Sequence, residues 1–502
     1  MPACKPLLLA LSIVLAAGRA EAQPLVVTHE TLEARIAHAE HVVVGTIAKV
    51  TETVITAPGG RATEGQYDYA LVLKIDERLK GNAKDEIENL RVIRTYARDT
   101  RYEEWRVAKT SLVWFIAPPE EANERGDWST LRLGKSVPAE SLYGQSGEPR
   151  LFASDLTLLK GERAILDRAR AYAKQSTKVL PTHVIDMPSV ALAKADKGFR
   201  NPWNHVVVPV DAALEPLAKR LIASPHEFVA ADDKLDDLSR YQLRFGGVCG
   251  LRHFKSETNA KLLLALLDDP PVDFKGSSIG PVPIRVKAFE ILLAWGVETP
   301  LPKSPDEVTR INLAGTAVTD ESLKPLAGLT NLAYLDVSFT KVTHEGLKPL
   351  AGLKKLALIQ LDDAQVTSAM LGTLREMGML HTLPHAAGAV RDVRPDSDDE
   401  IVRLELYHIP LTDAGLKELV GLKSLADLRL QGACVTDAGL KELARLPKLT
   451  TLFLLQMKLT DAMLKEVANI KSLTTLGLYG TKYPPAALAD LQQTLPKCKI
   501  ER

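Results

Sequence analysis

Residues 412–417 and 436–441 both read TDAGLK, and close variants stand at 319–324 (TDESLK), 343–348 (THEGLK) and 460–465 (TDAMLK). Within the pairs 319/343, 412/436 and 436/460 these hexapeptides start 24 residues apart. A fixed period of this length predicts stacked supersecondary units, each too small to bury its apolar face alone. Residues 304–502 are therefore expected to form one repeat domain.

A short alternating segment precedes each hexapeptide and is expected to be a strand. The predicted strand cores are residues 311–313, 335–337, 359–361, 404–406, 428–430, 452–454 and 476–478. Alternation turns two apolar side chains inward and the residue between them outward. The threonine of each hexapeptide is expected to cap a short helix, with the neighbouring aspartate facing the positive helix end.

The outward residues of these strands form a grid that we predict to be a concave binding face. They mix arginine, aspartate and tyrosine, and the Tyr and Arg side chains dominate the energies of protein interfaces. The alternative is that these side chains bind no ligand and are simply the residues that any exposed strand surface must carry. The candidate residues are Arg310, Asn312, Tyr334, Asp336, Gln360, Asp362, Arg403, Glu405, Tyr407, Asp427, Arg429, Gln431, Phe453, Leu455 and Tyr479. The expected ligand is a protein or a peptide.

One repeat breaks the pattern, because Thr367 is followed by the next Thr-Asp pair only at Thr412. A strand is expected at Leu383, and residues 384–400 contain no leucine. The array is therefore predicted to consist of two blocks joined by an irregular repeat that bulges on the convex side, at about 380–400. The acidic run 396–400 is interpreted as a solvated loop, with calcium binding as the alternative.

The repeats resemble the T-D-x-G-L-K-x-L leucine-rich repeats of exported bacterial proteins, especially those of planctomycetes. The resemblance covers the repeat domain and implies a solenoid with a parallel β-sheet. It implies no single function, since such repeats serve many roles.

The N-terminal residues 1–22 have the pattern of a secretory signal peptide: Lys5, an apolar run, and a small-x-small site at 20–22. We therefore expect export to the periplasm, the cell surface or the medium, without membrane insertion. The 63 basic and 63 acidic residues balance, which argues against nucleic-acid binding. Cys249, Cys434 and Cys498 lie far apart and are expected to be buried rather than bridged.

Residues 23–160 are predicted to be rich in strands, at 41–50, 67–75, 90–96, 111–116 and 128–133, after a short helix at 32–39. The stretches AHAEHVVVGTIAKV, YDYALVLKIDERLKG and TSLVWFIAP resemble the netrin-like OB barrel of tissue inhibitors of metalloproteinases. Those inhibitors use an N-terminal cysteine to chelate zinc. This chain has no cysteine between residue 23 and Cys249, so the resemblance implies only the barrel fold.

Residues 161–303 are predicted to be mainly helical, at 162–175, 211–223, 256–268 and 285–295, with an irregular connection at 181–204. The segment IRVKAFEIL after an Asp-Pro stop resembles HEAT-type helical pairs; a generic helical hairpin is the alternative. Either one would cover the first repeat as a spacer. The fold class expected for the whole chain is multidomain α/β: a β-barrel, a helical spacer and a solenoid.

We find no sequence motif for a nucleophile, a phosphate loop, a dinucleotide or a metal, so no enzyme activity and no cofactor are predicted. His38 and His41 are interpreted as surface histidines, with metal binding as the alternative. The first hypothesis is an exported, non-catalytic protein that binds a protein through its repeats. The alternatives are an enzyme or protease inhibitor acting through the barrel, and an F-box-like adaptor.

Overall fold

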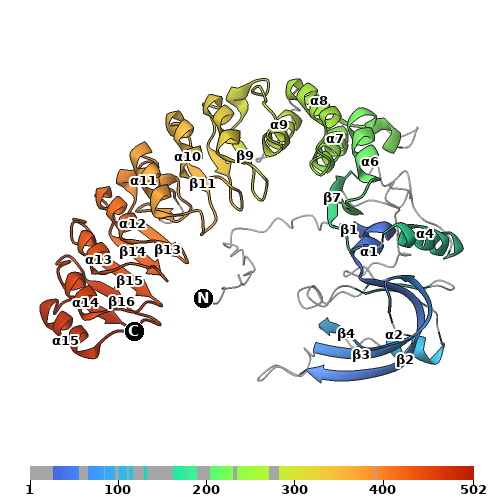
Figure 1. Ribbon diagram of the computed structural model, residues 1–502, viewed down its shortest axis with the longest axis horizontal. Helices are drawn as coiled ribbons and strands as arrows, with labels where there is room; N and C mark the ends of the chain where they lie inside the picture. The colour runs from blue at the N-terminus through green and yellow to red at the C-terminus, as the bar shows by residue number, and fades with distance from the viewer. Residues whose placement is uncertain are drawn as a thin grey trace. The chain divides into compact units, whose positions relative to one another are not determined.

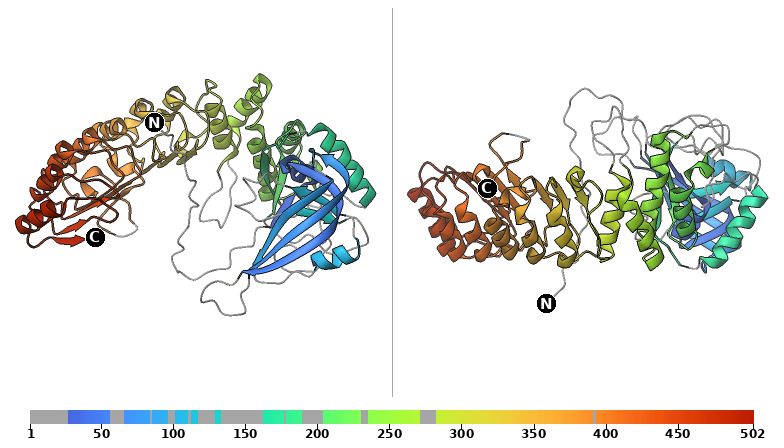
Figure 2. Two further views of the ribbon diagram at one scale, coloured as in Figure 1. Left: turned by 60° about the horizontal axis from the view of Figure 1, so that its bottom comes forward. Right: turned by 90° about the horizontal axis from the view of Figure 1, so that it is seen from above.

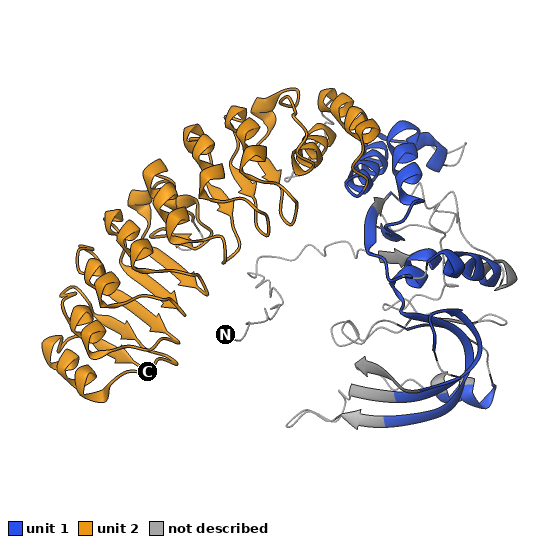
Figure 3. Ribbon diagram, viewed as in Figure 1, with its two compact units in different colours: residues 1–253 blue, residues 254–502 orange. Residues whose placement is uncertain are grey.

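The computed structural model describes residues 27–55, 66–83, 85–95, 101–109, 112–116, 129–132, 162–176, 178–188, 204–229, 235–270, 282–390 and 393–502. The predicted signal peptide lies outside these ranges. The chain forms two compact units, residues 1–253 and residues 254–502 (Figure 3). The predicted domain boundaries at 160 and 303 stay predictions.

Unit 1 contains a five-stranded antiparallel sheet in the order β4-β3-β2-β5-β6. Its strands are β2 (His41–Ile55), β3 (Gln66–Lys80), β4 (Glu86–Thr95), β5 (Leu112–Ile116) and β6 (Ser129–Arg132). The long strands β2 and β3 curve strongly (Figure 2). In the part of the chain that the structure describes, β4 and β6 are the edges, so closure into a barrel stays a prediction.

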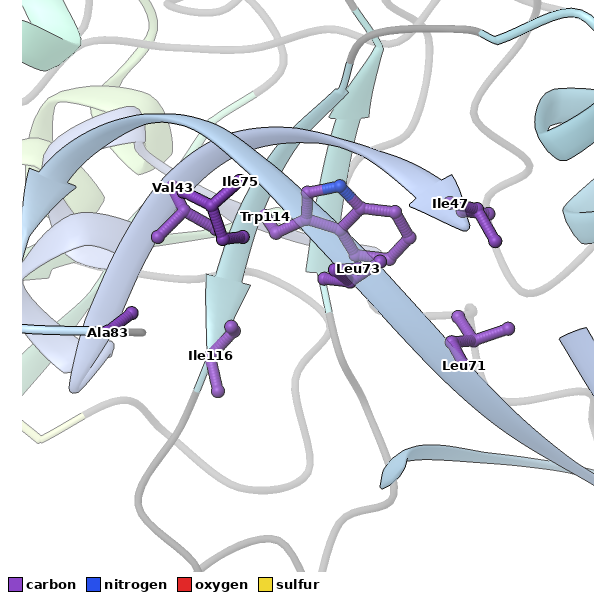
Figure 4. Packing of buried hydrophobic residues seen from close by; sticks show 8 residues of the cluster. All are labelled: Val43, Ile47, Leu71, Leu73, Ile75, Ala83, Trp114 and Ile116. Atoms are coloured by element: carbon purple, nitrogen blue, oxygen red, sulfur yellow. The ribbon is translucent and has the colours of Figure 1, made fainter. Parts of the chain in front are cut away.

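Apolar side chains on one face of this sheet form a buried cluster around Trp114 (Figure 4). Leu71 and Leu73 of β3 and Val43 of β2 are fully buried in it. The indole Nε1 of Trp114 donates to the carbonyl of Gly45, 3.2 Å away, so the polar end of the ring is satisfied.

Helices α1 (Leu32–His38) and α4 (Glu162–Gln175) contribute to a second buried cluster, and α2 (Arg101–Val107) precedes β5. Lys80, at the end of β3, is buried beside α1. Its Nζ donates to the carbonyls of Ile36 (2.8 Å), Ala37 (3.1 Å) and Lys178 (3.0 Å). The lysine thereby joins the sheet to carbonyls in the last turn of α1.

A second sheet of unit 1 corrects the prediction for residues 181–204. Strands β7 (Thr182–Met187) and β8 (Asn204–Pro209) are antiparallel, and β8 also pairs in parallel with β1 (Val27–Glu30). The short runs HVIDM and HVVVP carry the β-branched residues that favour strands. The prolines and charged residues around them favoured the prediction of an irregular connection instead. Helices α6 (Leu214–Ala223) and α7 (Asp237–Leu251) follow, with a 3-10 turn at Pro225–Phe228.

Unit 2 begins with helices α8 (Glu257–Ala265) and α9 (Ile284–Ala294). Ser256, at the predicted start of this helix, caps α8 by accepting a hydrogen bond from the backbone N–H of Asn259. On α9 the buried Glu290 accepts from the backbone N–H of Asn312 (2.6 Å) and from Lys287 (2.8 Å). Glu290 thus satisfies a backbone donor at the end of the first repeat strand, Arg310–Asn312.

The repeats form parallel strands on one side and short helices on the other (Figure 1). The strands are β9 (Arg310–Asn312), β10 (Tyr334–Asp336), β11 (Leu358–Gln360), β13 (Arg403–Tyr407), β14 (Asp427–Gln431), β15 (Thr451–Leu455), β16 (Thr475–Gly477) and β17 (Lys499–Glu501). The helices are α10 (His344–Leu347), α11 (Ser368–Met377), α12 (Asp413–Glu418), α13 (Asp437–Leu443), α14 (Asp461–Ala468) and α15 (Pro485–Thr494), with 3-10 turns such as Asp320–Gly328. All seven predicted strand cores overlap strands; β17 was not predicted.

The repeat leucines point into a continuous core, where Leu335, Leu428 and Leu452 are fully buried. The carbonyl directly before each of the strands β9, β10, β13, β14 and β15 accepts two backbone N–H groups of the following repeat. The carbonyl of Ala333, for example, accepts from Ala357 (2.9 Å) and Leu358 (3.1 Å). Successive repeats are therefore joined by core packing and by a regular backbone ladder.

The strand predicted at Leu383 is wrong, and the sheet is interrupted there. Strands β9–β11 form one sheet and β12–β17 another, in which β12 (Ala386–Ala387) runs antiparallel to β13. Leu383 is buried and follows a 3-10 turn. The strands thus fall into two blocks, and this pairing places part of the irregular repeat at the sheet rather than on the convex side.

The Arg394 guanidinium supplies hydrogen-bond donors at the point of the described chain where no strand follows β11 in the backbone ladder. Its Nε donates to the carbonyl of Ala357 (3.3 Å), and its Nη2 donates to those of His381 (3.1 Å) and Leu383 (2.5 Å). Burial lowers the pKa of this guanidinium. In a regular repeat the position of Ala357 would face the N–H groups of a following strand. The side chain therefore replaces missing backbone partners.

The aspartates of the hexapeptides do more than start helices. Asp413 accepts from both the N–H (2.7 Å) and the hydroxyl (2.6 Å) of Thr436 in the following repeat. A Cβ on Gly439 would overlap Asp413, so the glycine of one repeat leaves room for the aspartate of the repeat before it. Asp320, Thr343 and Gly346 repeat this arrangement.

The cysteine prediction holds in part. Cys498 is buried, Cys249 is intermediate and Cys434 is exposed. Val435 is the residue that directly precedes the hexapeptide, and it takes the inward position. Cys434 lies one residue before this inward position, so the prediction that it is buried was wrong.

Candidate functional site

The strand face is defined here as the outward side chains of β9–β11 and β13–β17. Pairing register places these side chains in rows across the sheet. Arg403 lies beside Asp427, Glu405 beside Arg429, and Arg429 beside Phe453. Because the sheet is interrupted, the candidate residues form two groups instead of one grid.

The group on β13 and β14 is centred on Asp427, which is only 9% exposed. Arg403 Nε donates to its Oδ2 (2.8 Å), and Arg429 donates to Oδ1 (3.1 Å) and Oδ2 (3.0 Å). The hydrogen bond with Asp427 raises the pKa of Arg429 above its usual value, and Glu405 adds attraction from 3.7 Å. Two guanidinium groups are thus held on one carboxylate.

An aromatic pair continues this network across β15 and β16. The guanidinium of Arg429 lies 4.8 Å from the centre of the Phe453 ring. The Phe453 and Tyr479 rings stack with centroids 6.3 Å apart and an interplanar angle of 16°. A Cβ on Gly477 would lie 2.9 Å from Phe453 Cγ, so glycine makes room for the ring. These contacts fix a cation–aromatic ladder.

The outer end of the ladder is open to solvent. Tyr479 is 46% exposed, and its hydroxyl donates to Glu501 Oε2 from 3.2 Å. Burial of its ring and the charge of Glu501 raise the pKa of this tyrosine. The face therefore presents a neutral phenol and a permanently charged guanidinium at neutral pH.

The group on β9 and β10 has a smaller cation–aromatic contact. The Arg310 guanidinium lies 4.0 Å from the centre of the Tyr334 ring. Tyr334 donates its hydroxyl to Asp336 (3.2 Å), and Asp336 also accepts from the N–H (3.0 Å) and hydroxyl (2.7 Å) of Ser338. Burial is the main cause that raises the pKa of Tyr334.

Other predicted residues have structural contacts. Asn312 Oδ1 accepts from the N–H of Ala314 (3.0 Å). Asp362 accepts from the backbone N–H groups of Phe339 (2.8 Å) and Ala364 (2.9 Å). These side chains hold the turns that follow the strands.

Among the described residues, the two metal sites considered as alternatives, at His38 and His41 and at the run 396–400, lack a cluster of metal-binding side chains. No group of three or more His, Cys, Asp or Glu side chains suited to a metal ion occurs in the described ranges, which include His38, His41 and the run 396–400. In that run, Asp398 accepts from the backbone N–H (2.8 Å) of His381 and contacts its Nδ1 (2.9 Å).

A pocket of about 500 Å³ in the repeat unit is lined by Arg375, Lys417 and Arg445, among others. Arg375 pairs with Glu418 (3.2 Å) and Arg445 with Glu442 (2.8 Å). These pairs partly neutralise its basic lining, so it is a weaker candidate than the strand face.

Phe339 was missed by the sequence analysis. Its side chain is 76% exposed, and it follows β10 in the turn beside the strand face. The sequence does contain a signal for this residue. In three other repeats the matching position is a glycine, namely Gly315, Gly432 and Gly480, so a phenylalanine there departs from the pattern.

Comparison with known proteins identifies one repeat directly. The family model for leucine-rich repeats matches residues 328–351. No curated protein matches the sequence. Solved structures with similarity include an internalin (InlF) of Listeria monocytogenes at 19% identity, covering 49% of this chain and 55% of that chain, with a TM-score of 0.23. Internalin C2 of the same bacterium is 20% identical and covers 42% of this chain and 89% of that chain, with a TM-score of 0.23. The plant peptide hormone receptor RGFR1 in complex with RGF2 is 15% identical and covers 39% of this chain and 32% of that chain, with a TM-score of 0.24.

The match spans only 55% of the length of the first internalin. Along the described residues, no helix has the length and hydrophobicity needed to cross a bilayer. The family model thus identifies residues 328–351 as a leucine-rich repeat, and parallel strands with the same spacing stand on both sides of it.

Proposed function

We propose that this chain is a non-catalytic binding protein whose strand face engages a protein ligand. The observation that carries the proposal is the ladder of Arg429, Phe453 and Tyr479. The leucines and hexapeptides recur because the core requires them, whereas this ladder does not recur and contributes little to the core.

The ladder has the properties of an interface centre. Arginine and tyrosine supply large contact areas, and aromatic side chains lose little conformational entropy on binding. The Arg429 guanidinium is already fixed by Asp427, which reduces the entropy cost of ordering it in a complex. Preorganised Arg and aromatic groups in a partly exposed row favour a protein or peptide ligand.

Site-specific photo-crosslinking tests this proposal. A benzophenone amino acid replaces Gln431 on β14, and in a matched control it replaces the exposed Lys441 on α13. We expect defined adducts from position 431 in cells that produce the protein, and few from position 441. The combined variant Tyr334→Ala/Arg429→Ala/Phe453→Ala should lose the adducts.

Equal adduct patterns from the two positions would show that the strand face has no special role. The same conclusion follows if the triple variant remains folded, as judged by circular dichroism, and keeps every adduct.

We also propose export, on the basis of the signal-peptide pattern at residues 1–22. Mass spectrometry of the protein recovered from its native cells should give an N-terminus near Gln23. An intact Met1 in the mature protein would contradict this.

A further inference from the structure

Six repeats turn through the left-handed region directly beyond their strands. The φ angles there lie between 52° and 67°, at corresponding positions of the two blocks. Three of the positions carry glycine and three do not. The glycines are Gly315, Gly432 and Gly480, and the other residues are Phe339, His408 and Gln456.

Glycine is the residue that this turn favours. A Cβ on Gly315 or Gly432 would meet no atom within 4 Å, so lack of space does not explain these glycines. The backbone angle does, because a left-handed conformation costs an L-residue about 1–2 kcal/mol. For a bulky residue such as Phe339, a positive φ is a genuine outlier.

Phe339 has a second unfavourable feature besides its backbone angle. It is 76% exposed, so an apolar ring faces water. The turn itself is held through the backbone, where the N–H of Phe339 donates to Asp362 Oδ2 (2.8 Å). A glycine would keep that hydrogen bond. Neither the turn nor the core therefore requires a phenyl ring, and an unexplained strained residue points to function.

Three aspartates and two basic residues, Arg310 and Lys341, belong to the repeat of Phe339 and the repeats beside it. Asp336 belongs to the same repeat, and Asp362 and Asp363 to the next one. The Asp363 side chain is 56% exposed, with His385 4.0 Å away. The cation Arg310 lies over the ring of Tyr334. A ligand that covers Phe339 thus meets excess negative charge, which favours a basic partner.

We propose that Phe339 anchors an extended polypeptide segment whose apolar side chains are flanked by lysine or arginine. The segment packs on the phenyl ring, and its cations face Asp336 and Asp363. This inference rests on the proposed binding function and deepens it, because it names the anchor and the chemistry of the ligand.

The test uses peptides selected from a random 12-residue phage-displayed library on the full-length protein. We expect the selected peptides to combine Lys or Arg with apolar residues. Their affinity, measured by fluorescence anisotropy, should fall at least about tenfold in Phe339→Gly, as for an interface anchor. The control Gln456→Gly changes the same kind of turn in the other block and should leave affinity unchanged.

Stability provides an independent readout of the strain. Phe339→Gly should unfold at the same or a higher urea concentration than the wild type, so its lost affinity cannot be ascribed to unfolding. Lower stability of Phe339→Gly would overturn the strain argument. Acidic selected peptides, or equal affinity for wild type and Phe339→Gly, would overturn the ligand assignment.

The two proposals can fail separately. Peptides that bind Phe339→Gly normally but not Tyr334→Ala/Arg429→Ala/Phe453→Ala would refute the anchor and leave the strand face as a binding site. Selected peptides that bind all three proteins equally would refute both.

Discussion

Substitution of Gly439 by alanine should destabilise the repeats when Asp413 is present and stabilise them when Asp413 is replaced by alanine. In most helices, replacing an interior glycine by alanine stabilises by about 1 kcal/mol. Here the added Cβ would lie 2.9 Å from Cγ and 3.0 Å from Cα of Asp413 and would overlap its Oδ1. The carboxylate must move, and it then loses its hydrogen bonds with Thr436 (2.7 and 2.6 Å).

The magnitude follows from those contacts. Each hydrogen bond to the half-exposed carboxylate contributes about 1 kcal/mol after allowance for solvent. Loss of both outweighs the gain in helix propensity, so Gly439→Ala should destabilise the wild type by about 1 kcal/mol. In an Asp413→Ala background the clash with the carboxylate is gone and only the tight contact with the Cα of residue 413 remains, so the same change should stabilise by about 0.5–1 kcal/mol.

The assay is hydrogen exchange at increasing urea, followed by mass spectrometry on peptides that cover α12 and α13. Local exchange is needed because the chain has two compact units and global unfolding is not two-state. The double-mutant cycle should give a coupling energy of about 2 kcal/mol between positions 413 and 439. If Gly439→Ala stabilises in both backgrounds, or the coupling is near zero, the proposed fit of aspartate and glycine is wrong.

Three further results are expected. Arg394→Met should destabilise the repeats by about 2–4 kcal/mol, because it unpairs carbonyls at the sheet interruption; exchange at 357–361 measures this, and wild-type protection there would contradict it. Burial lowers the pKa of His183 to about 3 and that of His253 to about 4. The unfolded state then binds more protons between pH 6.5 and 4, so unit 1 should lose stability as pH falls through this range, and His183→Gln should flatten the dependence of its unfolding midpoint on pH; an unchanged slope would refute the assignment. Gly477→Ala should displace the Phe453 ring and reduce photo-crosslinking from position 431 as much as Phe453→Ala does, whereas the adducts should persist if the ring keeps its place.

The sequence by itself determined the repeat architecture. The spacing of leucines and the recurring hexapeptides act within about one repeat, and such local periodicity is enough to predict strand, turn and helix. The predicted helix at 162–175 and the predicted helix start at residue 256 were also correct for local reasons, namely helical periodicity and a serine able to accept a hydrogen bond.

Features that depend on contacts between repeats could not be read from the local pattern. Asp413 appeared to be a helix-starting residue, but its carboxylate bonds to Thr436 of the next repeat. Arg394 lay in a segment without periodicity, and only the folded chain shows which carbonyls it reaches. Likewise, the interruption that divides the candidate site follows from the antiparallel pairing of residues 386–387.

For the strand face, too, the sequence determined some features and the tertiary structure decided others. Alternation identified which side chains point outward, because that depends only on the period of a strand. Which of them touch depends on register between strands and on the room left by Gly477, so the stacking of Phe453 and Tyr479 was decided by the tertiary structure. The strain at Phe339 was hidden for a related reason: a backbone φ angle is set by the turn that its repeat must make to reach the next one.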